Sequence, residues 1–154
     1  MSSPLPAPTI ITPEMMSLVG SETEPVTYDI ERGAIRKFAR AVGDLNPFYF
    51  DDEAARAAGY RGVVAPPTFL RSLIPGPEKR PFPEPFQQIL DGGSAYRFDE
   101  PLIAGDRITV VSRLVELFEK RGRLGPMLFK VREIRYEKQT GRVAATQRST
   151  TITY

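Results

Sequence analysis

Apolar residues recur at helical spacing in one stretch of the first third of the chain. Between positions 31 and 42 they form a single stripe, made of Ala34, Ile35, Phe38, Ala41 and Val42. Asp29 precedes the stretch as a candidate cap that accepts backbone hydrogen bonds. Gly43 follows it, and glycine commonly ends helices. The spacing predicts an amphipathic helix over residues 31–42.

Shorter elements flank this helix. Residues 13–19 predict one or two helical turns ended by Gly20, and residues 25–30 have strand character. Asp51 is expected to cap a second helix that Gly59 ends. Pro66-Pro67 predicts a short helix over residues 68–74, which Pro75 prevents from continuing. Residues 75–86 hold five prolines, and this predicts an extended loop.

The rest of the chain alternates between apolar and polar positions, as a half-buried strand does. Over residues 107–120 the apolar positions are Ile108, Val110, Leu114 and Phe118. Residues 127–136 and 142–154 continue the alternation, with hairpin turns expected at 122–125 and 139–141. Residues 87–90 and 94–98 predict two further strand segments, and residues 101–106 a turn. Helices followed by long antiparallel strands predict an α+β domain.

Composition limits the class of protein. A chain of 154 residues is expected to form one main domain, here residues 25–154, after an N-terminal arm and short helix at 1–24. The net charge is +2 and the basic residues are scattered, which argues against nucleic acid. No apolar run is long enough for a membrane span and the first residues lack a signal-peptide pattern, so we expect a cytoplasmic protein.

Two residue types are missing, and this excludes several chemistries. The sequence contains no cysteine, so disulfides and thiolate nucleophiles are excluded. It also contains no histidine, which removes the usual general base near neutral pH and the commonest metal ligand. Ser-His-Asp and Cys-His schemes are therefore excluded within this chain, and we expect no metal site.

Polar side chains concentrate in the loop over residues 43–68. Five of them fall within nine positions, interleaved with bulky apolar residues: Asp44, Asn46, Tyr49, Asp51 and Asp52. Loops of this kind carry function more often than the elements they connect. The loop is therefore the first candidate for a site.

The residues of this loop resemble a known family. Residues 43–51 read GDLNPFYFD, which is similar to the Asp-x-Asn-Pro-x-His-x-Asp signature of MaoC-like hot dog proteins, a group that includes (R)-specific enoyl-CoA hydratases and 3-hydroxyacyl-thioester dehydratases. GGSAYRFDEPLIAGDRI resembles the family's later strand and Gly-Asp turn. The resemblance runs from Pro25 to the C-terminal strands. It looks closest to N-terminal, non-catalytic-type halves, which also read VAPPTF.

The resemblance implies a fold and a mode of action. The expected fold is the hot dog fold, an antiparallel sheet wrapped around a central helix, with two units paired so that their sheets join. An acyl-CoA or acyl-carrier thioester would lie in a tunnel at that interface, without a cofactor. In catalytic members an Asp and a His hold the water, and backbone N–H groups at the start of the central helix polarise the thioester carbonyl.

This chain departs from the pattern at two positions. Tyr49 stands at the histidine position, and a phenol with a pKa near ~10 is a poor base at neutral pH. Pro66-Pro67 replaces His-Gly, so N–H donors are missing there. We take Asp44 and Tyr49 as a degenerate catalytic pair. The candidate substrate-binding residues are Asn46, Ala65, Thr68, Gly92 and Gly93.

Structural roles are the alternative for each of these residues. Asp44 could bind backbone N–H groups in a turn, Tyr49 could be a packing residue, and Gly92-Gly93 could form a β-bulge. For the whole chain we expect an acyl-thioester-binding subunit, in a homodimer or with a catalytic His-bearing MaoC-like chain. The alternatives are a homodimeric acyl-CoA binding or sensing module, or an enzyme of altered chemistry such as a thioesterase.

Overall fold

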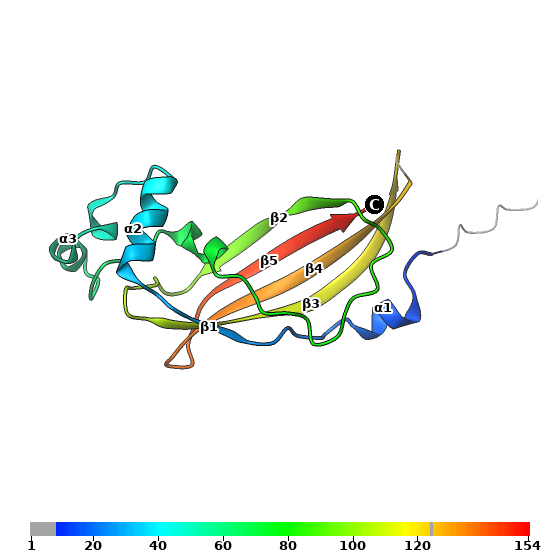
Figure 1. Cartoon of the computed structure of the whole chain (residues 1–154), viewed down its shortest axis with the longest axis horizontal. Coiled ribbons are helices and arrows are strands. Elements are labelled where there is room, and N and C mark those ends of the chain that lie inside the picture. The colour runs from blue at the N-terminus through cyan, green and yellow to red at the C-terminus, as the bar shows by residue number, and fades with distance from the viewer. Residues whose placement is uncertain (1–8, 124) are drawn as a thin grey trace, which may run out of the picture.

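The computed structural model describes residues 9–123 and 125–154. In them the chain forms one antiparallel sheet, with the helical residues 32–57 at one end and a short helix over residues 13–17 nearer the other (Figure 1). The strand order is β1-β3-β4-β5-β2. The strands are β1 (Val26–Asp29), β2 (Ile89–Phe98), β3 (Arg107–Gly122), β4 (Gly125–Lys138) and β5 (Val143–Thr153). The α-helices are α1 (Pro13–Ser17), α2 (Arg32–Ala41) and α3 (Asp52–Ala57), and the 3-10 helices are η1 (Pro47–Tyr49) and η2 (Pro67–Ser72). The predicted α+β class is confirmed.

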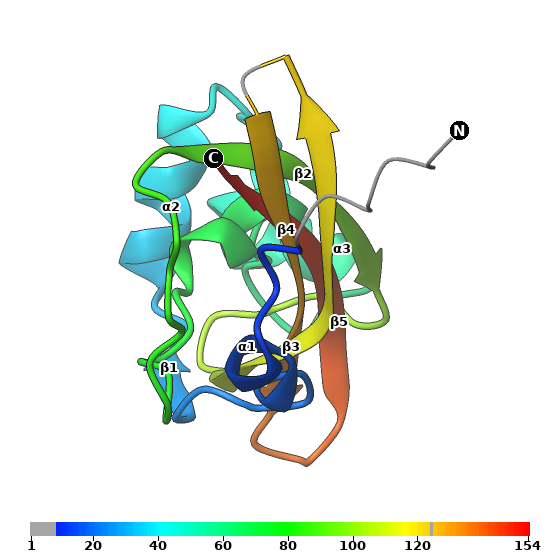
Figure 2. The same cartoon turned by 90° about the vertical axis from the view of Figure 1, so that its right-hand side faces the viewer.

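One face of the sheet, called here the inner face, carries the main core. α2 and the loop over residues 75–86 lie on one side of the sheet (Figure 2). Ile35 and Ala39 of α2 are fully buried in a cluster with Ile108 and Val110 of β3. Phe69 of η2 joins this cluster and packs edge-on against Phe38. A second cluster lies under α1, where Met15 contacts Leu117 and Leu128.

The proline-rich segment over residues 75–86, called here the crossing loop, crosses the inner face of the sheet. It contains no helix and no named strand, as predicted. Ion pairs hold it on the sheet: Lys130 binds Glu84, and Arg132 binds Glu78. The Lys130 ammonium also lies 4.9 Å from the centre of the Phe82 ring. Residues 75–86 therefore cover part of the inner face, and Phe82 and Phe86 pack against the same cluster as Met15 of α1.

The main helix matches its prediction, but its cap does not. α2 lies within the predicted 31–42, and Gly43 follows it with φ 74°, a conformation that favours glycine. The cap prediction for Asp29 is wrong, because Asp29 is the last residue of β1 and pairs with Arg107. Glu31 takes the N-cap position without a side-chain hydrogen bond. Of the predicted stripe, Ala34, Ala41 and Val42 are exposed.

The other short elements follow the sequence closely. Asp51 caps α3 by accepting a hydrogen bond from the Glu53 backbone N–H at 3.2 Å, as predicted. The short helix expected at 68–74 is the 3-10 helix η2. Prolines at its start and after its end leave little room for a longer helix. None of the helices in the described ranges is long and apolar enough to cross a bilayer.

Two β-bulges set which side chains point inward. In β3 the register shifts between Leu114 and Glu116, so Leu117 rather than Phe118 faces the core. The prediction that Phe118 shares the face of Leu114 is therefore wrong, and Phe118 stacks on Phe129 instead. In β2 the shift lies between Asp91 and Ser94, which joins the two predicted segments into one bulged strand. Residues 1–8 of the predicted arm, and residue 124 of the first hairpin turn, lie outside the described residues.

Candidate functional site

The start of the 43–68 loop is shaped by its own short polar side chains. The Asn46 backbone N–H donates to Asp44 Oδ1 at 3.3 Å, so the Asp44 carboxylate closes a local turn. Asn46 is the N-cap residue of η1, where Pro47 sets the first dihedral angle, but its side chain makes no capping hydrogen bond. The turn-forming role considered for Asp44 is thus present in the fold.

Tyr49 is the buried member of the candidate pair. It is 7% exposed and its ring packs edge-on against Phe48, with centroids 5.1 Å apart. Burial raises the pKa of Tyr49 above its ordinary value of 10.0, and the nearby Asp44 carboxylate raises it further. The phenol is therefore neutral at pH 7. It can donate a hydrogen bond but cannot take a proton from water.

Asp52 links the far end of the 43–68 loop to α2. Its Oδ1 accepts the Val63 backbone N–H at 3.1 Å, and its Oδ2 binds the Arg32 guanidinium. The hydrogen bond from Arg32 lowers the pKa of Asp52, and the Val63 N–H lowers it further. Asp52 thus joins α2, α3 and residues 63–65. The sequence indicated Asp52 only as one of the polar residues of the 43–68 loop.

A cavity of about 370 Å³ lies beside Tyr49, and we call it the apolar cavity. Phe48, Tyr60 and Leu70 line it, together with all of residues 64–67 and 98–102. Ala145 of β5 contributes from the sheet. Its charged members are Asp99 and Glu100. The cavity has the mainly hydrophobic lining of a small-molecule site, with a few polar groups at one side.

The wall formed by residues 64–67 has no free backbone donor. The Val64 N–H donates to the Phe48 carbonyl at 3.0 Å, and the Ala65 N–H donates to the Leu102 carbonyl at 2.8 Å. Pro66 and Pro67 have no N–H at all. A thioester carbonyl against this wall would therefore meet no oxyanion-type donor.

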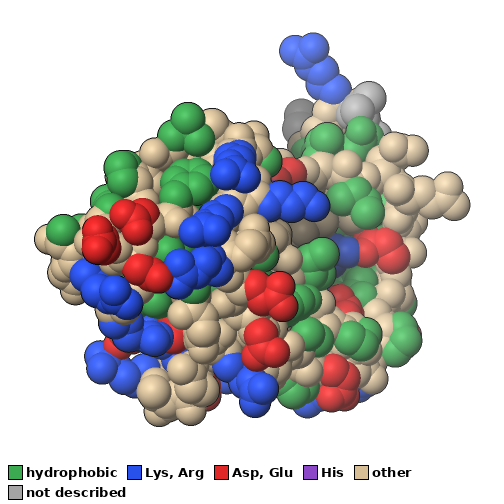
Figure 3. Space-filling view, turned by 60° about the vertical axis from the view of Figure 1, so that its left-hand side comes forward, with side chains coloured by type: hydrophobic (Ala, Val, Ile, Leu, Met, Phe, Trp, Pro, Cys, Tyr) green, Lys and Arg blue, Asp and Glu red, His purple; other side chains and the backbone are tan. Residues whose placement is uncertain are grey.

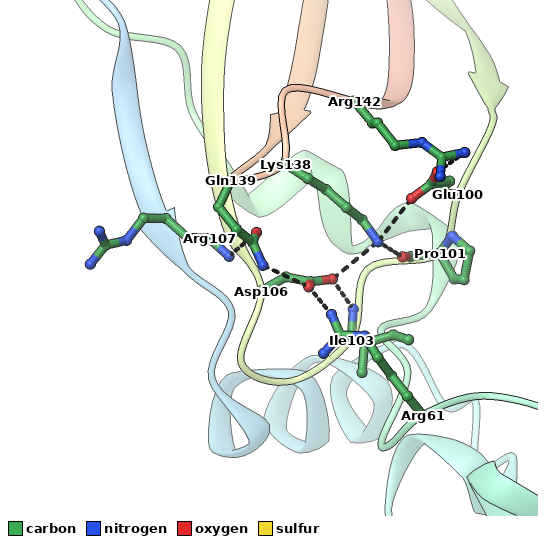
Figure 4. A network of polar contacts seen from close by, with 9 residues as sticks. All are labelled: Arg61, Glu100, Pro101, Ile103, Asp106, Arg107, Lys138, Gln139 and Arg142. Atoms are coloured by element: carbon green, nitrogen blue, oxygen red, sulfur yellow. Dashed lines mark hydrogen bonds and ion pairs between the residues drawn. The ribbon is translucent and has the colours of Figure 1, made fainter.

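A buried carboxylate fixes the opposite wall (Figure 4). Asp106 is 1% exposed, and its Oδ2 accepts the Ile103 backbone N–H at 2.9 Å. Lys138 Nζ lies 3.3 Å from that carboxylate and also donates to the Pro101 carbonyl at 2.8 Å. Arg61 forms a second ion pair with Asp106. The network connects the loop after α3, the turn before β3 and the β4–β5 hairpin.

Several cations at the helical end are used to hold the loop. Lys and Arg side chains are numerous on the face seen in Figure 3, with acidic side chains beside them. Arg36 donates to the Phe50 carbonyl at 2.6 Å, and the Arg40 guanidinium lies 5.6 Å from the centre of the Phe50 ring. These contacts tie α2 to the residues that follow η1.

The structure brings together only some of the residues selected from the sequence. Tyr49 and Ala65 line the apolar cavity, and Asp44 lies beside Tyr49. Thr68 is exposed on η2 and is not part of the lining. Gly92 and Gly93 form the β2 bulge. They border a separate hollow next to Phe118, on the face of the sheet opposite the inner face. Their bulge interpretation is confirmed.

Other parts of the site were missed by sequence reasoning. Residues 98–102 and Ala145 reach the cavity from β2 and β5, far along the chain from the loop. The sequence signal for residues 98–102 is the segment GGSAYRFDEPLIAGDRI, which contains them and resembles the family's later strand and turn. Within the described residues, no group of three acidic side chains is placed to hold a metal ion.

Comparison with known proteins decides the family. A family model described as FAS1-like, dehydratase domain region, matches residues 17–147. The chain belongs to this FAS1-like dehydratase family. A UPF0336 protein of Parafrankia is 40% identical over 102 residues, which cover 63% of this chain and 68% of that protein. A probable enoyl-CoA hydratase alpha subunit of Thermomonospora curvata is 34% identical over 132 residues, covering 74% of this chain but 41% of that longer protein.

Solved structures agree on the fold of this FAS1-like dehydratase domain. A chain of the Mycobacterium tuberculosis HadBC (3R-hydroxyacyl-ACP dehydratase) complex superposes with a TM-score of 0.73 at 22% identity, covering 88% of this chain and 96% of that one. A chain of the ChsH1-ChsH2 complex from the same organism gives a TM-score of 0.75 at 22% identity, with 92% of each chain covered. The predicted hot dog fold and MaoC-like relationship are confirmed.

Proposed function

We propose that this FAS1-like dehydratase domain is an acyl-thioester-binding subunit of an (R)-specific enoyl-CoA hydratase or 3-hydroxyacyl dehydratase. It supplies no base of its own and relies on a His-bearing partner. The observation that carries the proposal is the pairing of two losses at one cavity. A neutral, buried Tyr49 stands where the base belongs, and the wall beside it offers no free N–H.

The chemistry explains why both losses matter. Hydration of an enoyl thioester needs a base for the water and donors for the developing enolate oxygen. The apolar cavity still suits the acyl portion of such a thioester, because its lining is mainly hydrophobic. Binding without turnover is therefore what the cavity supports.

The relatives are consistent with an assembly of unlike chains. One curated relative is described as an alpha subunit, and two structural neighbours were solved as complexes of two named components. In this chain, β2 is an edge strand of the sheet and exposes Ile89, Leu90 and Phe98. An exposed apolar edge strand pairs readily with another strand. We propose that β2 joins the sheet of the partner.

The test separates binding from catalysis. The purified chain should bind acyl-CoA in calorimetry yet show negligible hydration of crotonyl-CoA. Purification from the native host should bring down a chain that carries an intact Asp-x-Asn-Pro-x-His motif, and that complex should hydrate crotonyl-CoA. Robust turnover by the isolated chain would contradict the proposal. Acyl-CoA binding with no gain from any partner would favour a binding or sensing module instead.

A further inference from the structure

A second cavity, of about 290 Å³, lies on the inner face of the sheet beneath the start of the 75–86 loop, and we call it the polar cavity. Unlike the apolar cavity it is bordered largely by hydrogen-bonding side chains. The members that matter here are Glu78 from the loop and Ser112, Arg132, Ser149 and Thr151 from the sheet. Among the described residues, none lines both cavities.

Ser112 gives the polar cavity an unused hydrogen-bonding group. Ser112 is 2% exposed, and its hydroxyl is buried with no hydrogen-bond partner. Its backbone groups both bind Thr23. The Ser112 N–H donates to the Thr23 hydroxyl at 3.1 Å, and the Ser112 carbonyl accepts the Thr23 N–H at 2.9 Å. An unsatisfied buried hydroxyl is costly, so a group that binds it would gain a hydrogen bond at little desolvation cost.

Charge limits what that group can be. The Arg132 side chain is 19% exposed and forms an ion pair with Glu78, so the cavity carries no uncompensated charge. A guanidinium has five N–H donors, more than a single carboxylate uses. Arg132 and Ser112 therefore offer donors to a neutral oxygen, which favours a hydroxyl or keto group over an ion.

The two cavities lie along the same face of one strand. Ala145 lines the apolar cavity and Ser149 the polar cavity, four residues farther along β5. At about 3.3 Å per residue the separation is about 13 Å. Between them lies Gln147, which accepts from the Tyr136 hydroxyl at 2.8 Å and donates to Ser94 at 3.0 Å. The two cavities are thus neighbours along β5, one with a mainly apolar lining and the other with a mainly polar one.

We propose that the polar cavity binds a hydroxyl or keto oxygen on the distal part of the acyl group, with Ser112 as the specificity-determining residue. The inference rests on the proposed acyl-thioester binding and adds the substrate class, an oxygenated acyl chain. Ser112 donates its hydroxyl proton to that oxygen, and Arg132 contributes a second donor.

The test compares matched thioesters on the full chain. Acyl-CoA thioesters of increasing chain length are titrated calorimetrically, each beside its ω-hydroxy counterpart. At the length that spans the two cavities, the ω-hydroxy thioester should bind about two- to tenfold more tightly, as one buried hydrogen bond allows. Ser112→Ala should remove this preference and leave the affinity for plain chains unchanged, whereas Ser112→Thr should retain it.

Controls separate this inference from the proposed function. Thr146→Val removes a hydroxyl from the opposite face of β5, because neighbouring residues of a strand point to opposite faces, and it should keep the preference. Thermal melting checks that each variant folds. Equal affinities for plain and hydroxylated chains, or a preference that survives Ser112→Ala, would overturn the role of the polar cavity alone. Failure of every thioester to bind would overturn the proposed function as well.

Discussion

At the scale of single residues, two buried tyrosine hydroxyls can donate hydrogen bonds but cannot act as bases. Tyr49 borders the apolar cavity. Tyr136 of β4 is 1% exposed, and its hydroxyl donates to Gln147 of β5. Burial raises the pKa of both hydroxyls, because a phenolate in a poorly hydrated site is disfavoured. Each remains a hydrogen-bond donor across the physiological range. Neither can replace the imidazole that the chain lacks.

Restoring the imidazole alone should not restore catalysis. We expect Tyr49→His to bind acyl-CoA but to hydrate crotonyl-CoA no faster than the parent chain, because residues 64–67 still present no free N–H. The assay is loss of enoyl-thioester absorbance. Tyr49→Phe serves as the control for packing. A clear gain in turnover by Tyr49→His would show that the lack of free N–H donors at residues 64–67 does not prevent hydration.

Tyr136 predicts a pH dependence of stability. Its pKa is raised in the folded state, so its contribution to stability is complete below pH 10, where the unfolded chain's phenol begins to ionise, and is lost as the pH rises further. Urea denaturation from pH 8 upward should show stability falling above about pH 10. Tyr136→Phe should flatten this fall and cost about 1 kcal/mol at neutral pH, because Gln147 loses a donor. Identical slopes for parent and variant would refute this assignment.

At the scale of elements, the fold depends on connections between segments that are short and irregular. η2 and residues 63–65 have little regular structure of their own, and they are held by side chains from elsewhere. Asp106 anchors one side through Ile103 and Lys138, while Asp52 anchors the other through Val63. These two carboxylates attach both cavity walls to the rest of the fold.

Loss of the Asp106 carboxylate should lower the stability of the fold more than loss of an exposed ion pair such as Asp29–Arg107. Asp106→Asn removes the buried charge that pairs with Lys138 and Arg61 and leaves Glu100 as the carboxylate beside Lys138. We expect a loss of about 3 kcal/mol in the free energy of unfolding. The matched control is Asp29→Asn, whose pair with Arg107 is solvent-exposed and should cost less than about 1 kcal/mol. Equal losses in urea denaturation would contradict the network's role.

The start of the crossing loop leaves no room for a side chain at Gly76. A Cβ there would lie 2.2 Å from the Glu24 carbonyl oxygen, so the backbone would have to move. We expect Gly76→Ala to lower the melting temperature by several degrees. Gly33→Ala is the control, because its Cβ would meet nothing within 4 Å in α2 and should stabilise by about 0.5–1 kcal/mol. A neutral Gly76→Ala would mean that the loop moves freely.

At the scale of the whole molecule, the sheet ends at two unlike edges. β1 is a strand of four residues, whereas β2 has ten and exposes Ile89 and Leu90 at its start and Phe98 at its end. Long apolar edges are usually covered in native assemblies. The β2 edge is therefore where we expect a second chain.

Two isoleucines of equal exposure test this expectation. Ile89 in β2 and Ile74 after η2 are 68% and 67% exposed. Ile89→Lys should abolish association in analytical ultracentrifugation or co-purification, because it places a charge at the proposed strand pairing. Ile74→Lys should leave association unchanged. Loss of association in both variants, or in neither, would argue against the β2 edge.

Much of the secondary structure could be predicted because its signals are local. α2, α3 and η2 have their limits set by Gly43, Asp51 and the prolines around residues 66–75, whose backbone preferences act within a few residues. The cap at Asp29 could not be predicted, because pairing with β3 overrode the local preference. The face of Phe118 depended on a bulge that alternation alone does not reveal.

The sequence by itself determined the family resemblance, the α+β class and the loss of the base, since each depends on which residues are present and in what order. Only the tertiary structure decided that residues 64–67 have no free N–H, because the partners of Val64 and Ala65 are set by folding. It also decided that Ser112 has an unsatisfied hydroxyl in a cavity, on the same face of the sheet as the apolar site. Hydrogen-bond partners and cavities are properties of residues that meet across long distances in the chain. Local sequence therefore cannot specify them.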